Sequence, residues 1–381
     1  MNRRLLFWAV LTRLLVFIVI YLTFYSYFPG RPPAPADYEF TQGPLDWSPL
    51  NPLLLYDGGQ YTRIAEHGYV EELTVWFPFY PLLIRLLGLL TGNFGLAAAV
   101  IANISFFAAL ELLYRLARLD YGERVSFIAA VTIMVIPAGV FFNVAYSESL
   151  FLALILGSFY AARTERWWTA GILGGFAALT RNLGILVFPA LLMEYYWLNK
   201  KSRGIFALKY GFRKKLPAMA GIYMVPFLFC LYPGYLASRF GDPLAFIHGQ
   251  SGHFRAFRFP GWGIGADLVS MVQNPLDSFN FIILLNLLAL ILGVLALICI
   301  KRPSYRLYSL TYLFFITAMP LVKGNMPHST GLFRFILGLF PLYLFLGRTI
   351  SSRKGRYISA GISLFILLMM ASLLARKIYI A

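Results

Sequence analysis

The sequence Tyr-Asp-Gly-Gly-Gln-Tyr-Thr-Arg-Ile-Ala-Glu-His-Gly-Tyr occupies residues 56–69, and it is a polar segment in a largely apolar chain. An apolar run at 5–25 precedes it, and Trp76-Phe77-Pro78-Phe79-Tyr80-Pro81 opens another apolar stretch after it. A helix needs about 20 apolar residues to cross a bilayer, and the run at 5–25 has that length. The polar segment therefore lies in the first loop after a predicted membrane-spanning helix, which we expect to be an uncleaved anchor.

The composition extends this prediction to the whole chain. Of 381 residues, 59% are hydrophobic and 13% are charged, whereas a soluble domain has about 25% charged residues. Repeated apolar runs of spanning length predict a single integral-membrane helical domain over residues 1–381. The net charge of +17 would suggest nucleic-acid binding in a soluble protein. Here the basic residues gather between apolar runs, as the positive-inside rule requires, so we expect no nucleic-acid partner.

The stretch 76–92 is apolar but short, and Pro78, Pro81 and Arg85 interrupt it. It could span the membrane or lie along the outer interface. Charge placement favours the interface. If 94–116 runs inward, the arginines at 115, 118 and 124 face the cytoplasm, and they would face outward if 76–92 also spanned.

The same rule places the N-terminus in the cytoplasm, beside Arg3 and Arg4, and orders the remaining spans in a multi-pass protein of the cell membrane. The expected loops are a first outer loop at 26–93, a basic cytoplasmic loop at 199–216 and a second large outer loop at 238–278. Several short spans suggest broken or tilted helices around a cavity. The prediction is an all-α bundle of about eleven transmembrane helices at 5–25, 94–116, 125–144, 150–162, 168–180, 183–198, 217–237, 279–300, 307–322, 333–347 and 357–375, with a juxtamembrane helix in the first outer loop.

This topology brings charged residues from several segments to the outer face. Charges near hydrocarbon are costly unless they are paired or solvated, so a group of them at one membrane face is a hypothesis for a functional site. The group consists of Asp57, Glu148, Arg181, His248, His253, Lys323, His328 and Arg334.

Asp57 is the first candidate for chemistry. Its position before Gly-Gly-Gln also suits a helix N-cap, and the two roles are compatible. The glycines at 58 and 59 would leave space beside the carboxylate. Glu148 lies between two serines in an expected outer turn. Two outer carboxylates could act as a general base and as an orienting or metal-binding partner.

The arginines Arg181 and Arg334 interrupt apolar stretches near the outer boundary. They could reach toward lipid head groups, or bind a lipid phosphate through two parallel hydrogen bonds. Arg63 and Lys323 are weaker candidates of the same kind. The candidates for substrate contact, with an interfacial aromatic belt as the alternative for the tyrosines, are Tyr56, Gln60, Tyr61, Tyr80, Asn182, His248 and His253.

The sequence lacks the motifs of zinc sites, nucleotide-binding loops and disulfide frameworks. The histidines have no zinc-binding spacing, and no glycine-rich phosphate loop follows a strand. Cys230 and Cys299 lie inside apolar runs, so we expect neither a disulfide framework nor a metal site from them. No cofactor is required for the predicted chemistry, and a divalent cation (Mg²⁺ or Mn²⁺) bound at Glu148 is the alternative.

The segment at 56–69, followed by Phe-Pro-Phe-Tyr-Pro-Leu-Leu-Ile-Arg at 77–85, resembles the PIG-V family, which contains the second mannosyltransferase of GPI-anchor assembly and its bacterial relatives. Ala-Tyr-Ser-Glu-Ser-Leu-Phe at 145–151 and Leu-Thr-Arg-Asn-Leu-Gly at 179–184 fit the same pattern in the same order. Tyr56 is a departure, since the eukaryotic enzymes typically have Trp before the Asp. The compact chain and its short loops resemble bacterial members.

The resemblance implies a GT-C glycosyltransferase that takes a sugar, with mannose the first expectation, from a polyprenyl-phosphate donor on the extracytoplasmic face. Asp57 stands where such enzymes have a catalytic carboxylate, so it would act as base in an inverting displacement. The acceptor, a glycan or a lipid, stays open, and membrane lipids surround the site. A transporter or flippase of lipid-linked sugars would also need outer cations and broken helices, although no inverted repeat is visible. A non-catalytic assembly subunit is a further alternative.

Overall fold

The computed structural model of the chain describes residues 2–28, 49–202, 212–252, 255–322, 326–350 and 352–378, with no side-chain description at 201–202 and 212–215. Across these ranges the chain is helical, and an isolated bridge between Arg255 and Leu321 is the one β-type pairing. The α-helices are α1 (Arg3–Tyr27), α2 (Asp57–His67), α3 (Phe79–Thr91), α4 (Phe94–Asp120), α5 (Glu123–Val135), α6 (Glu148–Arg163), α7 (Trp167–Thr180), α8 (Val187–Ser202), α9 (Phe212–Phe240), α10 (Ala245–Gly252), α11 (Trp262–Gln273), α12 (Asn280–Cys299), α13 (Pro303–Ala318), α14 (Leu332–Phe335), α15 (Pro341–Thr349) and α16 (Arg353–Ala375). Short 3₁₀ helices are η2 (Asn51–Leu53), η3 (Glu71–Leu73), η4 (Pro137–Phe142), η5 (Asn182–Leu186) and η7 (Ile336–Gly338).

Among the described residues, five helices are long and apolar enough to cross a membrane: α1, α4, α12, α16 and the Leu216–Phe240 part of α9. A sixth candidate is the pair Leu332–Gly338 and Pro341–Thr349, whose two parts are bent by 88°. The chain is therefore an all-α, multi-pass membrane protein, as predicted. The count of about eleven spans stays a prediction, because helices such as α5 and α7, with 13 and 14 residues, are shorter than the ~20 residues that a span needs.

Two expected spans are broken by proline. The stretch 125–144 divides into α5 and η4 at Ile136, whose φ of −56° and ψ of 133° are not helical. Pro137 accounts for this break, because a proline disfavours the α conformation in the residue before it. The stretch 333–347 likewise divides before Pro341 into α14 with η7 and then α15.

The helix α6 lies at the centre of the bundle. All of its residues except Tyr160 and Arg163 are buried, and it contacts α4, α7 and α8. An α-helix rises 1.5 Å per residue, so the first residue, Glu148, and the last, Arg163, are separated by about 22 Å. The two ends of α6 therefore carry charges at two different levels of the bundle.

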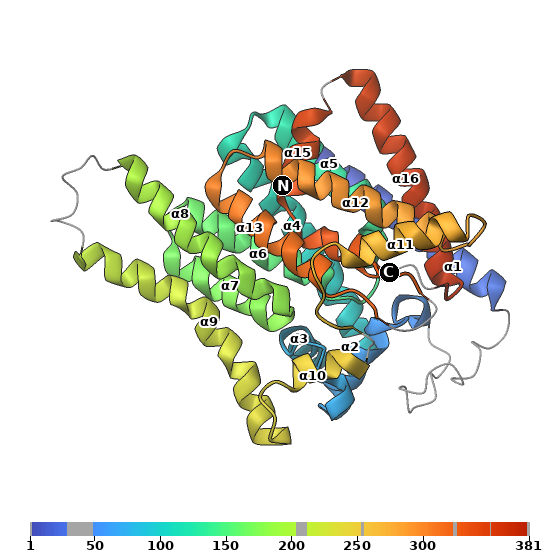
Figure 1. The fold of residues 1–381 in the computed structure, drawn as a ribbon, viewed down its shortest axis with the longest axis horizontal. Helices are drawn as coiled ribbons and strands as arrows, with labels where there is room; N and C mark the ends of the chain where they lie inside the picture. Colours follow the sequence, from blue (N-terminus) through green and yellow to red (C-terminus); the bar gives the residue numbers. More distant parts are fainter. Residues whose placement is uncertain are drawn as a thin grey trace.

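Around this centre, α7, α8 and α9 gather on one side of the molecule, and α1 and α16 lie on the other (Figure 1). The contact between α7 and α9 depends on glycine. A Cβ atom at Gly171 would lie 1.7 Å from the carbonyl oxygen of Gly221, and one at Gly175 would lie 2.5 Å from the Leu228 side chain. Small residues four apart are typical of closely packed membrane helices.

The structure describes only parts of the predicted loops. Residues 29–48, including the proline-rich part of the first outer loop, and residues 203–211 of the basic loop lie outside them. The stretch 238–278, predicted to be the second outer loop, contains α10 and α11. The helix α3 has 13 residues, which gives it about 20 Å of length against about 30 Å of hydrocarbon. Its placement along the interface stays a prediction.

We predict that Gly171→Ala lowers the melting temperature of the purified chain by several degrees. The added methyl must push α7 away from α9, and overpacking of this kind costs about 1–3 kcal/mol. Gly234→Ala is the matched control, because Gly234 lies on α9 with no atom within 4 Å of its built Cβ. An equal melting temperature for Gly171→Ala and the wild type would contradict the close contact.

The orientation is testable by cysteine labelling after Cys230 and Cys299, both exposed, are replaced by serine. Leu276 is 98% exposed in the loop before α12, and Lys301 is exposed in the loop after it. We expect a membrane-impermeant maleimide to label Leu276→Cys in intact cells and Lys301→Cys only after permeabilisation. The opposite pattern would invert the predicted topology.

Candidate active site

The segment around Asp57 has an unusual backbone. Tyr56 precedes α2 with a φ of 53° and a ψ of −119°, a conformation that is costly for a bulky residue. Asp57 is the first residue of α2, and the N-cap position belongs to Tyr56, whose side chain makes no capping hydrogen bond. The expectation that Asp57 caps the helix is therefore wrong, and its carboxylate is available for another partner.

That partner is Arg334, from the short helix α14. Its Nη2 lies 2.6 Å from the Asp57 Oδ2. The same guanidinium donates through Nε to the Oε1 of Glu148, at the start of α6. Arg181, which follows α7, donates from Nη1 to this Glu148 oxygen over 2.5 Å. Two carboxylates and two guanidiniums thus form one chain of ion pairs, which we call the outer network: Asp57, Arg334, Glu148 and Arg181.

The members of the outer network differ in burial. The Glu148 side chain is 4% exposed, Arg334 is 9% exposed and Arg181 is 14% exposed, whereas Asp57 is 25% exposed. Three members are therefore enclosed by protein, and one carboxylate has a face toward the surroundings. Charges taken out of water are tolerable only when they are paired and hydrogen-bonded, which explains why the two enclosed arginines share Glu148.

Aromatic rings complete the enclosure. The Arg334 guanidinium lies over the Tyr146 ring at 4.4 Å from its centroid, a cation–π contact. The Tyr61 hydroxyl shares a 2.8 Å hydrogen bond with the Ser147 hydroxyl, next to Glu148. Burial raises the pKa of Tyr61, so that hydroxyl stays neutral. Tyr61 thereby ties α2 to the beginning of α6.

Gly58 has a different role from the one expected. A Cβ atom there would lie 3.3 Å from the Leu53 carbonyl oxygen and 3.4 Å from the Ala145 carbonyl oxygen. The Ala145 N–H also donates to the Leu53 oxygen at 2.9 Å. Gly58 therefore permits close approach between α2 and the segment before Glu148, and the space beside the carboxylate is not what it provides.

Two buried oxygens near this site have no hydrogen-bond partner among the described residues. They are the Glu148 Oε2 and the Gln60 Oε1. Gln60 is three residues after Asp57 on α2, and residues at this spacing share a helix face. Buried acceptors are nearly always satisfied in native proteins. These two oxygens therefore mark a place for hydrogen-bond donors from a ligand or from water.

The other predicted residues fall in different surroundings. The rings of Tyr61 and Tyr80 are buried, at 3% and 0% exposure, and they contact each other edge-to-face at 4.9 Å, so they leave no ring face for a sugar. The Tyr56 hydroxyl donates to the Lys377 carbonyl oxygen at 2.5 Å. Arg63 is half-buried on α2, and Asn182 is exposed at the start of η5.

The histidines do not join the outer network in the described part of the chain. His248 is exposed on α10, and its Nδ1 lies 2.7 Å from the Asp242 carboxylate; this hydrogen bond lowers the pKa of Asp242. The backbone N–H of His328 donates to Asp267 at 2.7 Å, and its Nδ1 contacts the Leu321 carbonyl oxygen. His253 and Lys323 lie outside the described residues.

Metal binding at Glu148 was the alternative that the sequence left open. The described residues contain no group of three or more His, Cys, Asp or Glu side chains that could hold one. Arg334 contacts one oxygen of Asp57 and one of Glu148, and the second Glu148 oxygen has no partner among the described residues. The alternative in which Glu148 binds Mg²⁺ or Mn²⁺ stays a prediction from the sequence.

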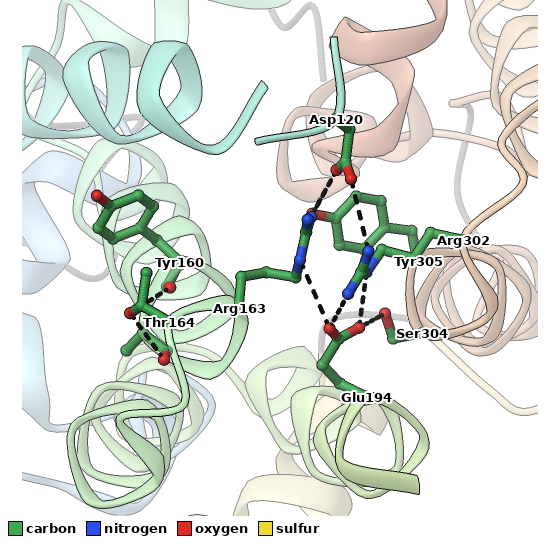
Figure 2. Close-up of polar contacts among 9 residues, drawn as sticks. Asp120, Tyr160, Arg163, Thr164, Glu194, Arg302, Ser304 and Tyr305 are labelled. Atoms are coloured by element: carbon green, nitrogen blue, oxygen red, sulfur yellow. Dashed lines mark hydrogen bonds and ion pairs between the residues drawn. The ribbon is translucent and has the colours of Figure 1, made fainter. Parts of the chain in front are cut away.

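A second charge cluster was missed by the sequence analysis (Figure 2). Glu194 of α8 is fully buried. Its carboxylate accepts a hydrogen bond from Arg302 Nε at 2.9 Å and one from the Ser304 hydroxyl at 2.5 Å. Arg163 contacts both Glu194 at 3.6 Å and Asp120 at 2.6 Å. We call this group the inner network: Asp120, Arg163, Glu194, Arg302, Ser304 and Tyr305. A carboxylate inside the apolar stretch 183–198 was the available signal.

The two networks lie at opposite ends of α6, through Glu148 and Arg163. In the inner network, both carboxylates have arginine partners, and the Tyr305 hydroxyl accepts a hydrogen bond from Arg163 Nη1 at 2.8 Å. It joins α4, α6 and α8 to the beginning of α13. This arrangement suits a structural clamp. Its Asp120 side chain is 18% exposed, close to the 25% of Asp57, so the outer network is distinguished as the candidate active site by the buried oxygens of Glu148 and Gln60 that have no partner among the described residues.

The first comparison with known proteins covers α1 to α8 and most of α9. The family model of mannosyltransferase (PIG-V) matches residues 2–235, a range that contains Asp57, Glu148 and Arg181. The chain belongs to this family. Arg334, the fourth member of the outer network, lies beyond the matched range.

Curated relatives match about half of the chain. The GPI alpha-1,6-mannosyltransferase 2 of Homo sapiens is 28% identical over 216 residues, which are 51% of this chain and 42% of the human protein. The protein of the same name from Cricetulus griseus is 30% identical over 213 residues, 51% of this chain and 42% of that protein. The chain thus spans less than half the length of these relatives.

The fold has a solved counterpart. The crystal structure of ArnT from Cupriavidus metallidurans bound to undecaprenyl phosphate matches with a TM-score of 0.52 at 14% identity, covering 94% of this chain and 63% of that one. At this identity the similarity concerns the fold alone. It agrees with the GT-C-type membrane fold expected from the resemblance.

We predict that Glu194→Gln lowers the stability of the purified chain by about 3–5 kcal/mol, because loss of the carboxylate leaves Arg302 and Arg163 enclosed with too little negative charge. The measurement is thermal or denaturant unfolding in detergent. Glu165→Gln is the control, since Glu165 is exposed at the turn after α6 and such changes stay within about 0.5 kcal/mol. Equal stability of the two variants would refute the clamp.

Proposed function

We propose that this PIG-V family member transfers a hexose, with mannose the first candidate, from a polyprenyl-phosphate-linked donor to a hydroxyl group of a glycan or lipid acceptor. The observation that carries the proposal is the Asp57 carboxylate, partly exposed and held by Arg334. The distribution of basic loops supports an extracytoplasmic site. The names of the curated relatives support mannose.

In the proposed reaction, Asp57 is the general base. It takes the proton of the acceptor hydroxyl while that oxygen forms a bond to the anomeric carbon of the sugar. The bond between this carbon and the phosphate oxygen breaks, and its electron pair leaves with the polyprenyl phosphate. One displacement inverts the configuration at the anomeric carbon. The leaving phosphate is a stable anion, so no general acid is needed.

Arg334 and Arg181 then have two tasks instead of the single one predicted from the sequence. Arg334 holds the Asp57 carboxylate in place, and Glu148 holds both arginines. A guanidinium has five N–H donors, and the ion pairs described above use two on Arg334 and one on Arg181. The remaining donors could stabilise the charge that develops on the phosphate.

Glu148 is thus proposed as a positioning residue, acting on Asp57 through Arg334. The unpartnered oxygens of Glu148 and Gln60 suit sugar hydroxyls, which are hydrogen-bond donors. Undecaprenyl phosphate in the ArnT structure supports a lipid-phosphate donor by analogy of fold only. No step of this proposal requires a metal ion or another cofactor.

The proposal predicts that Asp57→Asn lowers transfer from a labelled polyprenyl-phosphate-mannose by about 10²–10⁴-fold, the range attributed to general-base catalysis. Asp57 is 25% exposed whereas Glu194 is fully buried, and an amide oxygen can still accept a hydrogen bond from Arg334, so we expect a smaller loss of stability than in Glu194→Gln and measure the melting temperature beside the transfer rate. Glu66→Gln is the control on the same helix, because Glu66 is exposed. Radiolabel transfer by the chain in proteoliposomes is the measurement.

Transfer by Asp57→Asn at the wild-type rate would exclude Asp57 as the general base. Translocation of the labelled lipid across the vesicle membrane, with no cleavage of the sugar, would instead favour the transporter or flippase alternative. A chain that neither transfers nor translocates would be an assembly subunit.

A further inference from the structure

A second feature of the molecule lies away from the outer network. A cavity of about 980 Å³ opens between α1, α5, α12, α15 and α16, the helices that occupy the right and upper part of Figure 1. Its lining is mostly aliphatic and aromatic, with residues such as Leu11, Phe127, Val131, Leu288 and Ile362. This volume lies at the upper end of the range of about 300–1,000 Å³ that is typical of ligand sites.

The dimensions suit a hydrocarbon chain. The lining follows α5 from Glu123 to Val135, a rise of about 18 Å, and half of the bilayer's hydrocarbon thickness is about 15 Å. Protein interiors are close-packed, and water needs polar partners that an apolar lining does not offer. An alkyl chain that enters from the bilayer fills such a volume with favourable contacts.

One end of the cavity is cationic. Arg4, Arg124 and Arg356 line it where α1, α5 and α16 begin. None of these three side chains forms an ion pair with another described residue. Glu123 is the acidic residue in the lining, and its carboxylate lies 3.6 Å from Arg118. The positive ends of three helix dipoles point to the same place, so this end attracts an anion.

We propose that this cavity binds an anionic glycerophospholipid of the inner leaflet, with an acyl chain along α5 and the head-group phosphate between Arg4, Arg124 and Arg356. A free phosphate would contact the three arginines but leave the apolar volume unfilled. A neutral lipid would fill the apolar volume but bring no net negative charge to the arginines. Basic pockets between membrane helices on the cytoplasmic side suit anionic head groups. The inference does not depend on the proposed sugar transfer.

The test compares lipid binding to the full chain by native mass spectrometry in detergent, with phosphatidylglycerol and phosphatidylcholine of identical acyl chains. We expect the wild type to retain phosphatidylglycerol over phosphatidylcholine by roughly tenfold or more. The triple variant Arg4→Gln, Arg124→Gln and Arg356→Gln should lose this preference. A matched triple variant, Arg166→Gln, Lys301→Gln and Arg306→Gln, removes the same charge from exposed residues of the same membrane face outside the cavity and should keep it.

Two further variants test whether the acyl chain of the lipid lies in this cavity. Ala360→Trp on α16 and Ala289→Phe on α12 both fill the cavity from its lining, so each should reduce retention of both lipids, with melting temperatures that report whether either variant misfolds. Equal loss of preference in the two arginine triples would overturn the proposal, because diffuse surface charge would then explain binding. Undiminished retention in folded cavity variants, or selective retention of a polyprenyl phosphate, would overturn it as well.

Discussion

The outer network depends on the placement of one guanidinium, that of Arg334, between two carboxylates. A buried charge in a membrane protein is tolerable only with partners at hydrogen-bond distance. The partners, Asp57 and Glu148, come from α2 and α6. The 88° bend between the parts of the broken pair before Pro341 follows Arg334, and the close approach at Gly58 and the positive φ of Tyr56 flank Asp57. The strained backbone of Tyr56 thus lies next to these ion pairs, which is common at functional sites.

The central helix α6 connects this arrangement to a second one. At its far end, Arg163 joins the inner network, where Glu194 is fully buried and has both arginine and serine partners. The two networks have similar compositions, and each contains one partly exposed aspartate, Asp120 or Asp57. The inner one holds four segments of chain against each other, whereas the outer one has two buried oxygens nearby without a partner among the described residues. Unsatisfied acceptors, more than charge itself, separate a candidate site from a clamp.

Much of the candidate site could be predicted from the sequence, because a charged residue that interrupts an apolar run is conspicuous. Asp57, Glu148, Arg181 and Arg334 were placed on one membrane face by the alternation of spans and basic loops, and the structure brings all four together. The pairing itself could not be predicted: the arginines, expected to face a phosphate, are bound to the carboxylates. Tyr61 and Tyr80, expected to face a sugar, are buried, since an aromatic side chain looks the same in a sequence whether it lines a site or fills a core.

The sequence by itself determined the fold class, the family and the catalytic candidate, because apolar run length, basic loops and the 56–69 motif are local properties that need no neighbours. The tertiary structure decided what depends on distance between remote segments: the ion-pair partners of Asp57, the role of Gly58 as a contact point, the inner network around Glu194 and the cavity beside α5. Hydropathy indicates that a helix lies in the membrane. Only the packing of side chains from different helices, in a medium where each charge must find its partner, decides which residues meet.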